Sequence, residues 1–199
     1  NLEAEDAKLR DRYGRSLFGS STLVARKMVE AGVKFVNVFW DNYAPRLGIT
    51  DFGWDTHEVN FITLKDHYLP WLDRTYTALL EDLEHRGLLD ETLVVVMSDF
   101  GRTPRINKDG GRDHHGDLTP LIVAGGGMKM GQVIGRSDAM GSRPATNVYK
   151  PAHLFATVMH YLFDVGQLRL LPHLNRRPEN PVGQPSPIHH VFVPPPSAP

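Results

Sequence analysis

Acidic and histidine side chains that suit a divalent metal occur at three separated places in this 199-residue sequence. The first place is Asp55-Thr56-His57, where a carboxylate and an imidazole stand two residues apart. In extended backbone, residues i and i+2 point to the same side, so both groups can reach one ion. This pair suits zinc, manganese or iron, and with enough oxygen ligands calcium or magnesium. The alternative is structural: Asp55 caps a turn and His57 begins a helix.

Asp99 and His114 mark the second and third places. Asp99 follows the β-branched run 93–97, which is typical of a buried parallel strand, and open α/β sheets bind ligands where such strands end. Alternatively, Asp99 accepts backbone hydrogen bonds at the turn. Adjacent histidines rarely share one ion, so we expect His114 to be the ligand and His115 to contact substrate, while Asp113 can orient a histidine. A solvated loop cluster is the competing interpretation.

Four cations among these residues favour binding of an anion. Arginine forks suit phosphate, sulfate or carboxylate, and we expect Arg102 and Arg112 to hold such a group. A solvated cationic loop is the alternative. The four side chains are Arg102, Arg105, Lys108 and Arg112.

Alternating helices and strands must position these groups. Helices are expected from Ser20 or Ser21 to about Ala31, from Asn60 to about Arg86 and over 150–163, and strands over 33–40, 93–97 and 118–124, with a short edge strand at 132–134. This order predicts an α/β domain with a mainly parallel sheet flanked by helices. Because three clear strands make a thin sheet, we expect a partial domain. Between the strands, the polar loop 102–117 has a length that is typical of functional loops.

Composition excludes several classes of protein. The formal net charge of −1 gives no support to nucleic-acid or membrane-surface partners, and no run approaches the roughly 18 apolar residues of a spanning helix. The absence of cysteine excludes disulfides, thiolate metal sites and cysteine nucleophiles. Proline enrichment divides the chain into a domain over 1–171 and a tail over 172–199. No signal peptide is visible, but Asn1 is not a starting methionine, so we expect a piece of a longer protein.

Five ordered runs carry a family resemblance that extends from about Arg12 to Phe163. They are Ala25-Arg-Lys-Met-Val-Glu-Ala-Gly-Val-Lys-Phe-Val, Gly53-Trp-Asp-Thr-His-Glu-Val-Asn, Gly87-Leu-Leu-Asp-Glu-Thr-Leu-Val-Val-Val-Met, Phe100-Gly-Arg-Thr-Pro-Arg-Ile-Asn-Lys and Gly111-Arg-Asp-His. Together they resemble the domain-of-unknown-function family 1501, a sulfatase-like family of the alkaline phosphatase superfamily.

The resemblance implies an alkaline-phosphatase- or sulfatase-like α/β fold whose one or two divalent metals polarise a sulfate or phosphate ester. By motif order, the later metal ligands of that superfamily correspond to Asp55, His57, Asp99 and His114. Its nucleophile and first metal-binding Asp lie near the end of the first strand, so this chain is similar to the second half of such a protein. An N-terminal half or a partner chain is therefore expected to complete the fold. The resemblance also implies an exported or periplasmic protein.

The sequence departs from the superfamily pattern near the expected metal ligands. Phe100, rather than histidine, follows Asp99, and the gap between Asp55 and His57 is shorter than usual. His115 stands where relatives tend to have tryptophan. The first two departures count against a second metal ion and against ester hydrolysis itself.

We therefore expect a metal-dependent hydrolase of sulfate or phosphate esters, with this chain carrying the metal-binding half. Zinc, calcium and manganese are not distinguished. The nucleophile is expected upstream, while Arg102, Arg112 and His115 contact an anionic small-molecule ester. One alternative is a non-catalytic member of the same fold that keeps a metal or another ligand. The other is an interaction protein that docks a partner through its proline-rich tail.

Overall fold

The computed structural model describes residues 2–40, 53–168 and 170. The helices are α1 (Ala7–Tyr13), α2 (Leu17–Glu30), α3 (Asn60–Thr63), α4 (Leu69–His85), α5 (Pro151–Leu162) and α6 (Val165–Leu168), with 3₁₀ turns at Leu2–Ala4 and Leu89–Glu91 and a π-helical turn at Leu64–Tyr68. The strands are β1 (Leu93–Met97), β2 (Gly101–Arg102), β3 (His114–His115) and β4 (Leu121–Gly125). The expected tail at 172–199 and nearly all of the expected loop at 41–53 lie outside the described residues.

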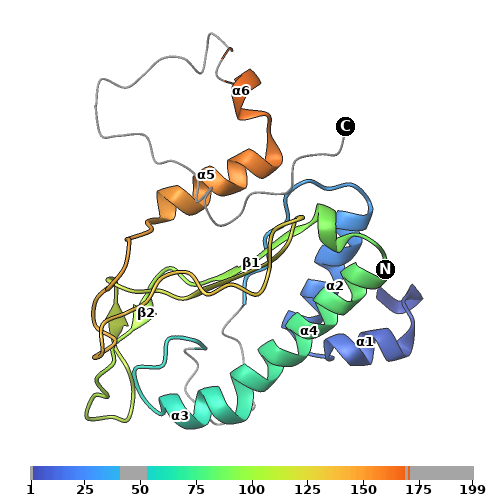
Figure 1. Ribbon diagram of the computed structural model, residues 1–199. Helices are drawn as coiled ribbons and strands as arrows, with labels where there is room; N and C mark the ends of the chain where they lie inside the picture. Colours follow the sequence, from blue (N-terminus) through green and yellow to red (C-terminus); the bar gives the residue numbers. More distant parts are fainter. Residues whose placement is uncertain (1, 41–52, 169, 171–199) are drawn as a thin grey trace.

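Helices α1, α2 and α4 gather on one side of β1, while α5 lies on the other side in Figure 1. The carboxylate of Asp6 caps α1, and the hydroxyl of Ser16 caps α2 by accepting a hydrogen bond from a backbone N–H. Helix α2 thus begins earlier than the expected cap at Ser20 or Ser21, because Ser16 supplies the cap first. The buried core of this bundle consists of Tyr13, Leu23 and Ala78.

A buried arginine joins the helices of this bundle. The Arg26 side chain has no exposed surface, and its guanidinium lies 3.0 Å from Glu5, 2.5 Å from Glu30 and 2.8 Å from Asp82. Its Nε meets Asp82 as an ion pair without hydrogen-bond geometry. Asp82 also accepts a hydrogen bond from the Tyr13 hydroxyl at 3.0 Å. Because a buried charge is costly without partners, this network fixes the relative positions of α1, α2 and α4.

The described strands pair antiparallel, which differs from the mainly parallel sheet that we expected. β1 pairs with β4, from Leu93 opposite Gly125 to Met97 opposite Leu121, and β2 pairs with β3. The stretch between β1 and β4 contains no helix, and parallel neighbours need a crossover that is usually helical. No parallel pair occurs within the described ranges 2–40 and 53–168. The alkaline-phosphatase-like architecture as a whole stays a prediction.

Some of the other expected helices and strands are present in the structure, and others are shifted or absent from the described residues. The long helix from Asn60 is confirmed as α3, the π-helical turn and α4, and the expected strand at 93–97 is confirmed as β1. The expected strand at 118–124 is shifted to Leu121–Gly125. The stretches 33–40 and 132–134 form no strand, because no segment among the described residues pairs with them as a neighbouring strand.

Much apolar surface stays uncovered on the stretch 33–40. Phe35 and Phe39 expose 64% and 81% of their surface, whereas Trp40 packs on Phe18 with ring centroids 3.8 Å apart. The stretch is therefore apolar on both sides, as in a strand of a sheet that is buried on both faces. In the part of the chain that the structure covers, no helix is long and apolar enough to cross a membrane.

Replacing Asp82 with Asn should lower the free energy of unfolding by roughly 3 kcal/mol, because it removes a charge that neutralises the buried Arg26. Urea unfolding measures the change. Asp11→Asn is the matched control, since it breaks an exposed ion pair with Arg15 and should leave stability unchanged. Equal midpoints for the wild type and the Asp82 variant would contradict a stabilising role for the network.

Glu5 should make the fold sensitive to acid. The hydrogen bond from Lys27 and the charge of Arg26 outweigh burial and hold the pKa of Glu5 below its ordinary value of 4.5. A lowered folded-state pKa contributes stability above pH 4.5, and this contribution disappears as pH falls through the lowered value. Glu5→Gln should therefore melt at a lower temperature at pH 7 and depend less on pH between 5 and 3. Parallel melting curves for both proteins across that range would refute this assignment.

Candidate metal centre

A short antiparallel pair sets the position of His114. β2 and β3 align Arg102 with His114 and Gly101 with His115. A side-chain carbon on Gly101 would lie 2.0 Å from the carbonyl oxygen of Leu118, so only glycine fits at this place. The close approach of the Gly101 and Leu118 backbones thus fixes the position of the strand that carries His114 and His115.

The loop between β2 and β3 docks on the segment that precedes α3. The backbone N–H of Arg112 donates to the carbonyl of Thr56 at 3.0 Å, and Asn60 N–H donates to the carbonyl of Gly110 at 3.2 Å. Glu58 and Gly110 also form an isolated antiparallel bridge. These bonds bring residues 55–57 beside residues 112–114, although the two segments are far apart in sequence.

Three donor atoms converge at this junction. The carboxylate oxygen Oδ1 of Asp55 lies 2.8 Å from His114 Nε2 and 3.1 Å from His57 Nε2, and the two Nε2 atoms are 3.0 Å apart. The three side chains are 41–48% exposed, so an ion from solvent can reach them. Within the described residues, they form the group of histidine and acidic side chains that can hold a metal ion.

Asp113 orients His57 from the opposite side of its ring. Its Oδ1 lies 2.9 Å from His57 Nδ1. Because the Asp113 carboxylate accepts at Nδ1, this contact favours the tautomer of neutral His57 that carries its proton on Nδ1 and turns the Nε2 lone pair toward Asp55 and His114. Hydrogen bonds from His57 and Asn107 hold the pKa of Asp113 below its ordinary value, which keeps the carboxylate charged. The expected orienting role of Asp113 therefore has a matching geometry.

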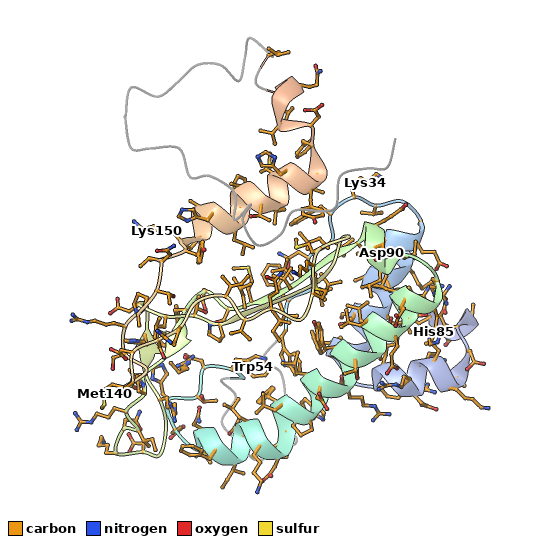
Figure 2. All side chains as sticks on the ribbon, viewed as in Figure 1. Lys34, Trp54, His85, Asp90, Met140 and Lys150 are labelled. Atoms are coloured by element: carbon orange, nitrogen blue, oxygen red, sulfur yellow. The ribbon has the colours of Figure 1, made fainter. Side chains whose placement is uncertain are left out.

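Arg102 binds the same carboxylate. Its guanidinium pairs with Asp55 Oδ1, and it also donates to the backbone carbonyls of Trp54 at 3.1 Å and Arg112 at 3.2 Å. Figure 2 shows Trp54 in the region between β1 and the helix formed by α3 and α4. Partial burial acts to raise the pKa of Asp55, but the hydrogen bonds from Arg102 and His114 outweigh it and lower the pKa. Asp55 is thus an ionised carboxylate.

The donor set and spacing fit a small divalent ion. Ligand atoms at about 2.0–2.1 Å from tetrahedral zinc lie roughly 3.3–3.4 Å from one another. The three separations here, 2.8, 3.0 and 3.1 Å, are slightly shorter than this spacing. Two imidazoles and one carboxylate on one side leave other coordination positions open, as in catalytic metal sites. The lone pairs of Asp55 Oδ1, His57 Nε2 and His114 Nε2 lie close together and repel one another unless a proton or a metal ion lies between them. A cation therefore suits this site.

The structure does not bring Asp99 to this group. Its carboxylate accepts hydrogen bonds from the Ser98 hydroxyl at 3.2 Å and from the backbone N–H of Phe100 at 3.0 Å. Asp99 thus accepts hydrogen bonds within the turn after β1, which is the structural alternative that the sequence offered for this residue. Of the four expected ligands, three therefore come together and Asp99 stands apart.

The expected substrate-binding side chains also have structural partners. Arg112 donates to the carbonyl of Thr103 at 3.1 Å and lies over the ring of Phe61. His115 Nε2 lies 2.8 Å from the carbonyl oxygen of Ser142. Neither contact directs the side chain toward Asp55, whereas Arg102 reaches it directly.

Sequence reasoning missed Asn107, which connects both sides of the centre. Its amide nitrogen donates to the carbonyl of His57 at 2.8 Å and to Asp113 Oδ1 at 3.0 Å. The available signal was the turn-forming run from Asn107 to Gly111, because asparagine in such runs often binds nearby backbone.

Arg102→Lys should lower the free energy of unfolding by about 1–3 kcal/mol, because a lysine cannot donate to two carbonyls and a carboxylate in the same geometry. Urea unfolding tests this expectation. Arg105→Lys, at an exposed position of the same loop, serves as the control and should have no effect. Unchanged stability of the Arg102 variant together with weaker sulfate binding would instead make Arg102 an anion-binding residue.

Comparisons with known proteins identify the family but no individual relative. No curated protein and no solved structure matches this chain. The model of one family, described as a protein of unknown function (DUF1501), matches residues 1–192. The chain therefore belongs to the DUF1501 family of proteins of unknown function.

Proposed function

We propose that this protein binds one divalent transition-metal ion at Asp55, His57 and His114, as the metal-binding part of a hydrolase of sulfate or phosphate esters. The observation that supports the metal is the convergence of three donor atoms within 3.1 Å of one another. The ester class is supported by the resemblance to sulfatase-like proteins of the alkaline phosphatase superfamily. The proposed substrate is a small anionic ester.

The donor chemistry favours zinc or manganese over calcium. Calcium takes six to eight oxygen ligands, whereas two of the three donors here are imidazole nitrogens. Imidazole suits zinc and other transition metals, and the carboxylate is compatible with zinc and manganese.

One metal ion, rather than two, agrees best with the surroundings of Asp99. Phe100 packs at a tilt against His114 with ring centroids 4.0 Å apart, and its apolar ring offers no ligand to a second ion. Asp99 accepts hydrogen bonds in its own turn. The departure from the superfamily at Phe100 is thus consistent with a single-metal site.

Each side chain of the centre has a distinct part in this proposal. When bound, the ion would act as a Lewis acid toward an ester oxygen. Asp55, His57 and His114 hold it, Asp113 keeps the Nε2 lone pair of His57 available, and Arg102 keeps Asp55 in place. A nucleophile from another segment is required, as expected from the family resemblance.

A non-catalytic, metal-binding member of the same fold is the second candidate. The observation that favours it is the bonding of Arg102, whose terminal nitrogens donate to Trp54, Arg112 and Asp55. A guanidinium with these partners has no complete fork left for a tetrahedral anion. The contacts of Arg112 and His115 with protein carbonyls add to this argument.

We further propose that an N-terminal half or a partner chain covers the apolar side of 33–40, where Phe35 and Phe39 are exposed. Strands that are apolar on both faces belong inside a sheet covered on both sides. Export of the protein is proposed on the family resemblance alone.

Calorimetric titration with zinc, manganese and calcium tests the metal centre. One equivalent of zinc or manganese should bind to the wild type, and calcium should bind weakly. His57→Ala and His114→Ala should each weaken binding by more than the roughly 10–100-fold that loss of an outer partner costs. Asp99→Ala is the informative comparison, because three ligands predict unchanged affinity and a four-ligand site predicts a large loss. Absence of stoichiometric zinc or manganese binding would refute the proposal.

Turnover separates the two candidate functions. The chain is joined to the N-terminal half that is expected to supply the nucleophile, loaded with metal and assayed with 4-nitrophenyl phosphate and 4-nitrophenyl sulfate, in parallel with its His114→Ala variant. Metal-dependent release of 4-nitrophenol that disappears in the variant supports the hydrolase, whereas binding without turnover supports the non-catalytic member.

A further inference from the structure

Asn107 lies at the tip of the loop between β2 and β3, and its side chain uses every hydrogen-bonding position that it has. The amide oxygen accepts from the backbone N–H groups of Asp109 at 3.0 Å and Gly111 at 2.9 Å. The amide nitrogen donates to the carbonyl of His57 at 2.8 Å and to Asp113 at 3.0 Å. A flipped amide would face two N–H groups with its own donors, so the network itself defines the orientation.

The loop tip is pressed against the backbone of His57. A side-chain carbon on Gly111 would lie 1.8 Å from the carbonyl oxygen of His57, which leaves room for glycine alone. Asn107 and Gly111 are also joined by a backbone hydrogen bond of 2.9 Å. The amide of Asn107 thus sits where it reaches both His57 and Asp113.

Burial cannot hold Asp113 in place, because its side chain is 55% exposed. Its Oδ1 receives two hydrogen bonds, from His57 Nδ1 and from the amide of Asn107. The second bond restricts rotation of the carboxylate and keeps it aimed at His57. A freely rotating Asp113 would let His57 exchange its proton between the two ring nitrogens, and the lone pair of Nε2 would be lost part of the time.

We propose that Asn107 is a positioning residue: through Asp113, it selects the tautomer of His57 whose Nε2 can bind a metal ion. This inference deepens the proposed metal centre and rests on it for the affinity readout. The tautomer readout is independent, because it is measured on the metal-free protein. Outer hydrogen-bond partners of metal-binding histidines typically contribute about 10–100-fold to metal affinity.

The test is a double-mutant cycle with Asn107→Ala, Asp113→Asn and the double variant, using zinc affinity at fixed pH. Asn107→Ala should weaken zinc binding by about 10–100-fold. In the Asp113→Asn background the same change should have little further effect, since Asn107 acts through Asp113. Lys108→Ala is the matched control, because this neighbouring side chain is 91% exposed and should change nothing.

Nitrogen-15 NMR of the histidine rings supplies the second readout. In the metal-free wild type, His57 should carry its proton on Nδ1, and in Asn107→Ala it should show a mixture of both tautomers. A purely structural Asn107 would lower the melting temperature but leave the tautomer unchanged, and its effect on affinity would add fully to that of Asp113→Asn. Either result would overturn the inference. If the wild type binds no zinc but Asn107→Ala still changes the tautomer of metal-free His57, the metal centre is refuted and the control of the tautomer by Asn107 stands.

Discussion

One guanidinium group holds together the two segments on which the candidate centre depends. Arg102 donates to the carbonyls of Trp54 and Arg112 and pairs with Asp55, so it bonds to the segment before α3 and to its own loop at once. Backbone carbonyls are fixed points, unlike flexible side chains, and a planar fork with several donors can bond to more than one of them. The carboxylate of Asp55 is therefore placed by main-chain geometry, and the two histidines meet at a position that is already determined.

The long helical stretch from Asn60 and the first strand could be predicted from the sequence, because their signals are local. The spacing of apolar residues over 60–86 and the β-branched run at 93–97 depend on nothing outside those stretches. Strand direction could not be predicted, because it depends on which segment becomes the neighbour and on whether a helix intervenes. For the same reason the stretch 33–40, which has the composition of a strand, forms none among the described residues.

Residue chemistry indicated the donors of the centre, but it could not indicate their directions. Asp55, His57 and His114 have the right atoms and do converge. Asp99 has the same atoms and lies at the end of a strand, yet a turn that begins with Ser98 gives it backbone and hydroxyl partners first. The bonds of Arg102 to carbonyls were not predictable, since every residue has a carbonyl and no sequence signal marks the one that will be reached.

The separation of the donors along the chain gives a bound ion a mechanical role. His57 and His114 are 57 positions apart, so an ion held by both closes a long loop. By the chain-entropy relation for a covalent cross-link, a closure of this span stabilises a fold by on the order of 4 kcal/mol. Unlike a disulfide, such a cross-link forms and opens with the supply of free ion. In a chain without cysteine, a bound ion would add to the bonds that already join these two segments, and a chelator would remove that added stability without breaking a covalent bond.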